Sequence, residues 1–227
     1  MNKTTGDTNT FTWVKAIILI IMFVGLLISI YERIWFNVFL VSLLLLLTLT
    51  PTILYKRYKF VIPPEIEIIA IIFIFASGYL GDIREYYDKY WWWDKVLHFS
   101  SGILLGIVGF LIVYILNKIK RFMIYMKPAF VALFSFTFAV SIGAIWEIYE
   151  FAMDKFFDLG MQSHKLYSDL EDTMWDIILD TLGAAIISIL GYFYMSRNKE
   201  FFINDLLTNF IEHNPKLFKK RKSKPST

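Results

Sequence analysis

The chain has 227 residues, of which 57% are hydrophobic and 19% aromatic, and its formal net charge is +3. It carries several apolar runs longer than those of a soluble domain, so the composition indicates an integral membrane protein. The chain has no cysteine, which excludes disulfides and thiolate metal sites.

Taken in chain order, the apolar runs predict an all-α, polytopic membrane helical bundle of about six transmembrane helices. The first run lacks the cleavage site of a signal peptide, so we interpret it as a retained helix. The third run is short for a bilayer, and a re-entrant or interfacial helix is its alternative. The predicted spans cover residues 14–30, 34–54, 66–80, 96–116, 129–153 and 173–195.

Aromatic residues crowd the connection before the fourth span. They are Tyr86, Tyr87, Tyr90, Trp91, Trp92 and Trp93. Such residues are typical of the membrane–water interface, and an aromatic belt is the favoured interpretation. A lip that binds lipid headgroups is the alternative.

The last segment, residues 196–227, has apolar residues at helical spacing and ends in a run of lysine and arginine at 219–224. The spacing predicts an amphipathic helix on the cytoplasmic membrane surface, and the basic run could bind anionic lipid. A disordered cytosolic tail that only sets the topology is the alternative.

Basic residues fix the expected orientation. Lysine and arginine are concentrated in the second and fourth connections and in the tail, whereas the third and fifth connections carry more acids. Because basic residues mark the cytoplasmic side, both termini are predicted to be cytoplasmic. If residues 66–80 did not cross the membrane, the basic connections would lie on opposite sides of it. The charge pattern therefore favours a spanning helix at 66–80.

Ionisable residues enter three of the predicted helices, where a charge costs roughly 2.5–3.5 kcal/mol on insertion scales. Spacings of three and four place them on one face of each helix. They are Asp94 and His98 in the fourth helix, Glu147 and Glu150 in the fifth, and Asp172, Asp176 and Asp180 in the sixth. The predicted topology brings the three groups to one level on the outer side, which predicts a polar site. For Asp172, a solvated or capping role is the alternative.

Clustered carboxylates at low dielectric cannot all stay ionised without a countercharge. Protonation, pairing with Lys95 or Lys155, and a bound cation are the three solutions. For a cation, the predicted ligands are His98, Glu147, Asp176 and Asp180, and Asp94 or Glu150 would act as general base. Oxygen ligands with one imidazole suit Mg²⁺, Mn²⁺ or Ca²⁺, with Zn²⁺ or Fe²⁺ as further options.

Three motifs resemble those of a bacterial family. Residues 94–102 match D-K-x-x-H-F-x-x-G, residues 147–150 match E-x-x-E, and residues 176–184 match D-x-x-x-D-x-x-G-A. Over roughly residues 60–195 the chain resembles the YjdF-like proteins of the bacterial inner membrane, and more distantly the VanZ-like proteins associated with glycopeptide resistance. VanZ-like sequences usually carry E-x-x-Q and a following loop arginine, so these departures favour the YjdF-like family.

The residues leave three functions open. The first is a metal-assisted enzyme that acts on a lipid or lipid-linked envelope substrate, with membrane lipids as partners. The second is a transporter or ion-coupled carrier, although no Gly/Pro-broken inverted repeat is seen. The third is a non-catalytic protein whose polar cluster fastens helices together. No nucleic-acid partner is predicted, because the basic run has no nucleic-acid fold around it.

Overall fold

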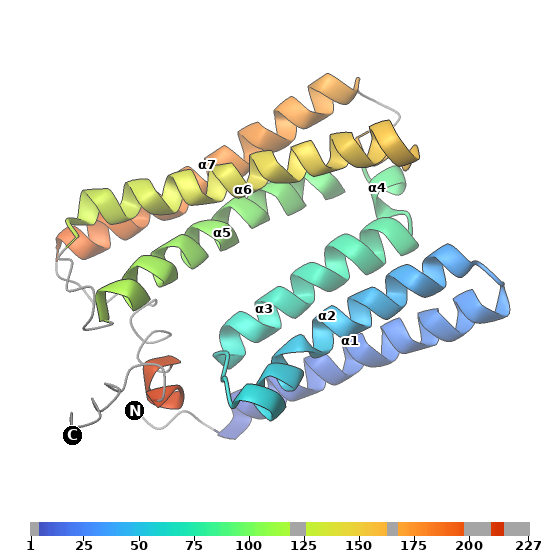
Figure 1. The fold of residues 1–227 in the computed structure, drawn as a ribbon, viewed down its shortest axis with the longest axis horizontal. Coiled ribbons are helices and arrows are strands. Elements are labelled where there is room, and N and C mark those ends of the chain that lie inside the picture. The colour runs from blue at the N-terminus through green and yellow to red at the C-terminus, as the bar shows by residue number, and fades with distance from the viewer. Residues whose placement is uncertain (1–4, 119–125, 163–167, 198–209, 216–227) are drawn as a thin grey trace, which may run out of the picture.

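The computed structural model describes residues 5–118, 126–162, 168–197 and 210–215. All regular elements in these residues are helices, which confirms the predicted all-α fold (Figure 1). In chain order they are α1 (Thr5–Tyr31), α2 (Trp35–Tyr58), α3 (Pro64–Ile74), the π-helix η1 (Phe75–Ile83), α4 (Tyr86–Lys89), α5 (Trp93–Lys118), α6 (Pro128–Phe157) and α7 (Asp169–Ser196).

Six of the described helical stretches are long and apolar enough to cross a membrane, which is the number predicted. They are Thr10–Tyr31, Trp35–Tyr58, Pro64–Ile83, Trp93–Val113, Pro128–Phe157 and Asp169–Ser196. Large apolar side chains are exposed on the outer faces of these helices, as expected for contact with lipid; Ile148 is 66% exposed.

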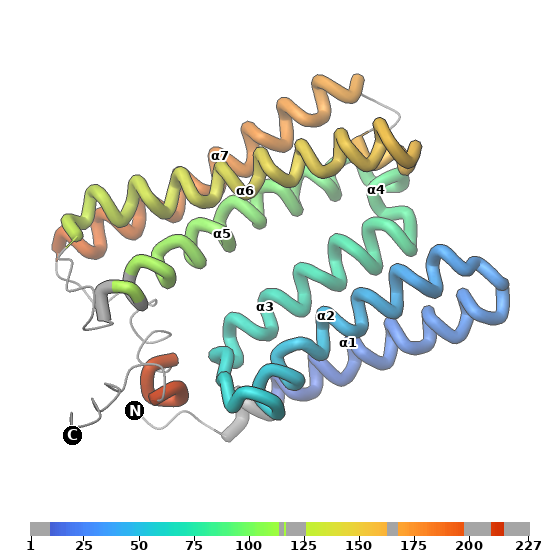
Figure 2. Tube along the Cα trace, viewed as in Figure 1, coloured from blue at the N-terminus to red at the C-terminus, as the bar shows by residue number. Residues whose placement is uncertain are grey.

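The spans form two groups of three helices that lie side by side (Figures 1 and 2). In the first group, α1, α2, α3 and η1 pack around Met22, Val41 and Ile71. In the second, α5, α6 and α7 pack against one another, and Phe110, Val113 and Val131 form a core at one end. The short helix α4 lies on the connection between the groups.

The third span is longer than the apolar run at 66–80. It begins at Pro64, where proline at the first helical position is favoured, and continues without a break from α3 into η1. The resulting stretch has 20 residues, which is long enough to cross a bilayer core of about 30 Å. The re-entrant alternative rested on the shorter predicted run and loses that support.

The sixth span begins four residues before its predicted start. The hydroxyl of Ser168 accepts a hydrogen bond from the backbone N–H of Glu171, and acids in the first turn complement the helix dipole. Asp172 is therefore inside the helix and does not cap it. Its side chain is buried and pairs with Lys95, so the solvated alternative is wrong for this residue.

A polar contact ties together the first group at the end away from α4. Lys15 of α1 donates hydrogen bonds to the Glu67 carboxylate of α3 and, at 3.1 Å, to the hydroxyl of Thr52 in α2. Three helices thus share one ammonium group.

Most of the predicted tail helix, and the basic run at 219–224, lie outside the described residues. Within the described part, residues 210–213 are helical. The Asn214 side chain accepts a hydrogen bond from the Val61 N–H at 2.9 Å and donates one to the Val61 carbonyl at 2.8 Å. This part of the tail is therefore held against the connection between α2 and α3.

Candidate metal centre

The close approach of α5 and α7 sets the geometry of the site. A Cβ on Gly102 of α5 would run into the backbone carbonyl of Asp180, and a Cβ on Gly183 of α7 would run into that of Phe99. Two glycines therefore let the backbones touch, as small residues do in membrane helix pairs. This contact brings Asp180 opposite His98.

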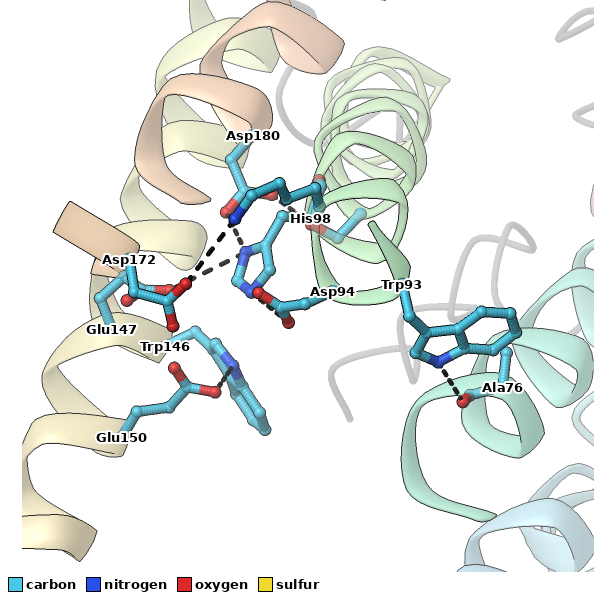
Figure 3. Close-up of polar contacts among 11 residues, drawn as sticks. Ala76, Trp93, Asp94, His98, Trp146, Glu147, Glu150, Asp172 and Asp180 are labelled. Carbon is cyan, nitrogen blue, oxygen red and sulfur yellow. Dashed lines mark hydrogen bonds and ion pairs between the residues drawn. The ribbon is translucent and has the colours of Figure 1, made fainter. Parts of the chain in front are cut away.

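His98 lies at the centre of the polar cluster (Figure 3) and is 7% exposed. Its Nδ1 is 3.2 Å from Oδ2 of Asp180 and 3.8 Å from Oε1 of Glu147. Its Nε2 is 3.6 Å from Oδ1 of Asp94. One imidazole from α5 thus contacts carboxylates of α5, α6 and α7, so the structure brings together at least one predicted polar residue from each of the three helices.

Asp180 uses both carboxylate oxygens within the protein. Oδ2 faces His98, and Oδ1 accepts a hydrogen bond from the hydroxyl of Ser101. The carboxylate also packs against Gly143 of α6, where a Cβ would leave it no room. Such a carboxylate–histidine contact fixes the orientation of the imidazole and, with the proton on Nδ1, leaves the Nε2 lone pair for a ligand.

Three side chains satisfy the spacing that a single cation requires. Each of Asp94, His98 and Asp176 offers a ligand atom, and these atoms all lie within 4.8 Å of one another. Asp176 is 2% exposed, and its Oδ1 is buried without a hydrogen-bond partner among the described residues. A buried carboxylate oxygen without a partner is costly, so this oxygen fits a cation or a proton.

The predicted site residues are thus divided by the structure. His98 and Asp176 belong to the group with ligand spacing, and Asp94, predicted as a general base, joins them. Asp180 lies on the other side of the imidazole. Glu147 is 4% exposed, and neither of its oxygens makes a hydrogen bond within the described part of the chain.

Glu150 lies one turn further along α6. Its Oε1 accepts a hydrogen bond at 2.8 Å from the indole N–H of Trp146, on the side of Glu147 away from Asp180 (Figure 3). It makes no direct contact with His98 among the interactions that the structure describes. Its role as a general base stays a prediction.

The cluster has more acid than base. Lys95 forms an ion pair with Asp172 at 3.7 Å, so the predicted pairing with Lys95 is present for that acid. Four more carboxylates surround His98, and they come from Asp94, Glu147, Asp176 and Asp180. One lysine and one imidazole cannot neutralise five carboxylates, so protons or a cation must supply the difference.

Tyr87 is a site neighbour that the sequence interpretation missed, because its residue type fits an aromatic belt. Its ring packs on Gly81 of η1, where a Cβ would clash with it. Burial, and then the charges of Asp82 and Asp94, raise the pKa of the Tyr87 phenol above its usual value. The phenol therefore stays protonated beside the carboxylates and can donate a hydrogen bond.

Comparison with known proteins gives a family and one distant relative. A family described as "Predicted membrane protein (DUF2238)" matches residues 11–197. An uncharacterized protein of Thermotoga maritima is 30% identical over 131 residues, which are 58% of this chain and 64% of that protein. No solved structure matches the chain. The family match includes all of the residues of the polar cluster.

Proposed function

The chain belongs to the DUF2238 family of predicted membrane proteins. From its polar cluster we propose that it is a metal-assisted enzyme of the bacterial inner membrane that acts on a lipid or lipid-linked envelope substrate. The observation that carries the proposal is the group of Asp94, His98 and Asp176, whose ligand atoms lie within 4.8 Å of one another in a buried setting. An imidazole among carboxylates suits a divalent ion such as Mg²⁺, Mn²⁺ or Zn²⁺.

The proposed roles follow the contacts. Asp94, His98 and Asp176 would hold the ion, and Asp180 would orient His98 through Nδ1. Glu147, whose two buried oxygens make no hydrogen bond within the described residues, would be a further ligand or would act as general base. A bound divalent ion supplies a Lewis acid and lowers the pKa of a coordinated water.

The orientation and the closer family assignment are part of the proposal. The basic connections support cytoplasmic termini, which would put the cluster in the outer leaflet. The three motifs support a YjdF-like protein. The more distant VanZ-like resemblance supplies no activity here.

A thermal stability assay tests the metal proposal. A ligand that binds only the folded state raises its stability, so a chelator should lower the Tm of the detergent-purified full chain, and Mg²⁺, Mn²⁺ or Zn²⁺ should restore it. Asp176→Asn and His98→Ala should abolish the response. Asp88→Asn, an exposed acid on α4, should keep it.

A non-catalytic role is the second candidate, and one observation favours it. Asp180 of α7 bonds both His98 and Ser101 of α5, so it already fastens two helices together. If the wild type melts identically with and without chelator and contains no stoichiometric metal, the cluster is a proton-sharing or helix-fastening network and the enzyme proposal fails.

A further inference from the structure

An apolar cleft of about 380 Å³ lies between α3 and α5, outside the polar cluster. It is lined by one face of α3 and the start of η1, from Ile69 to Ala76, and by one face of α5, from Trp93 to Leu104. Both faces belong to candidate membrane spans. The cleft has the volume of a small-molecule site, for which about 300–1,000 Å³ is usual.

The side chains that line the cleft offer an occupant no free hydrogen-bond donor. Of its lining residues, only Ser100 and Trp93 carry side-chain polar atoms. The Ser100 hydroxyl donates to the Val96 carbonyl at 2.7 Å, and the indole N–H of Trp93 donates to the Ala76 carbonyl at 3.2 Å. An occupant therefore gains only apolar contacts, which fits hydrocarbon and not a headgroup.

Size and surroundings narrow the occupant further. A helix is about 10 Å across with its side chains, so another protein helix could only lie over the cleft and could not enter it. The medium around a membrane span is lipid, whose hydrocarbon chains are thin and flexible. A single hydrocarbon chain is the occupant that matches the small volume, the apolar lining and the membrane setting.

The same helix carries the cleft and the polar cluster on adjoining faces. Trp93 and Leu97 line the cleft, and their chain neighbours Asp94 and His98 belong to the cluster. In Figure 3 the contact between Trp93 and Ala76 lies on the side of α5 away from Glu147. A molecule with a chain in the cleft would thus have its polar end near the first turn of α5.

We propose that the cleft between α3 and α5 binds one hydrocarbon chain of the substrate, so that the substrate class is a lipid with a long alkyl or prenyl chain and a polar head directed to the cluster. That the bound lipid is a substrate rests on the proposed function. Chain binding itself needs no cation, and it can be measured independently of the metal.

Photo-crosslinking tests the inference on the full chain. The protein is reconstituted in phosphatidylcholine vesicles that contain a trace of phosphatidylcholine with a diazirine in one acyl chain, irradiated, and mapped by peptide mass spectrometry. Adducts should be severalfold more frequent on the cleft faces of α3 and α5 than on the exposed face of α6 around Ile145, which is 59% exposed.

Filling the cleft should remove the signal. Ser100→Phe places a ring in the cleft and should lower the cleft adducts severalfold, and Ile72→Trp, at a 48% exposed position, is a second variant in case the first does not fold. Ile145→Phe is the matched control on the lipid-facing surface and should leave them unchanged. Adducts spread evenly over all exposed helices, or unchanged in both filled variants, would overturn the inference.

The cluster variant Asp176→Asn separates the two proposals. It should lose metal and keep the cleft adducts. If the wild type binds metal but its cleft is not labelled selectively, the substrate class is wrong and the metal site stands. If the cleft is labelled but no metal is bound, the chain site stands without the enzyme. A cleft that gives no adducts because a second copy of the chain covers it would also overturn the inference.

Discussion

Gly183→Ala tests whether the contact between α5 and α7 sets the polar cluster. The added Cβ would meet the Phe99 carbonyl and, at 3.0 Å, the backbone nitrogen of Ile103. Both obstacles are backbone atoms of a helix, so no side chain can rotate away. The helices must therefore separate.

The loss of stability has two sources, which are the overpacking itself and the contacts that are broken when the helices separate. Forcing one extra methyl into a packed interface costs about 1–3 kcal/mol. The distance of 3.2 Å between His98 and Asp180 is near the upper limit of a hydrogen bond, so a small separation breaks it. In membranes such a bond averages only about 0.6 kcal/mol, so overpacking dominates the loss of stability. For a chain of this size we expect Tm to fall by about 2–12 °C.

The assay is thermal unfolding of the purified full chain in detergent, followed together with metal content. Leu182→Ala is the matched control, because this neighbouring side chain is 50% exposed on the lipid-facing side and its loss should change Tm little. Gly183→Ala should lower both Tm and metal content. A Gly183→Ala protein that melts like the wild type would refute the argument that touching backbones hold the cluster.

Three further predictions concern regions around the site. In intact cells, an impermeant thiol reagent should label Leu159→Cys and not Lys56→Cys, because the connection after α6 is predicted to be outside; the reverse pattern would contradict the topology. Above pH 10 stability should fall as the unfolded chain releases the Tyr87 proton that the folded chain retains, and Tyr87→Phe should flatten that fall in pH-dependent melting. Lys15→Met should lower Tm more than Glu67→Gln, because the latter keeps a hydrogen-bonding side chain; equal melting of the two variants would argue against the shared ammonium.

Hydropathy and charge were sufficient to predict the coarse structure. The apolar runs and the basic connections predicted six helices, with Asp94, Glu147 and Asp180 at one depth. In the structure, His98 contacts all three of these carboxylates. The spacing of the acids defines the helix face on which each of them lies. Together with the predicted depth, this is enough to predict that the acids of the three helices form one cluster.

The finer assignments depend on packing that the spacing does not encode. Asp180 turns to Ser101 and His98 because Gly102 and Gly183 let two backbones touch, and this contact leaves Asp94 as the carboxylate nearest to Nε2. The ring of Tyr87 packs on Gly81 because its connection folds back onto η1, and there the charge of Asp94 acts on its phenol. No periodic pattern marks a loop residue of this kind, and its residue type suited the membrane interface equally well.

The metal content of the purified full chain tests the central claim most directly. Protein purified without added metal or chelator is analysed for its elements, next to Asp176→Asn and the Asp88→Asn control. We expect a stoichiometric divalent metal in the wild type and in the control, and its loss from Asp176→Asn. A wild type that contains no stoichiometric divalent metal, and takes up none on dialysis against Mg²⁺, Mn²⁺ or Zn²⁺, would contradict it.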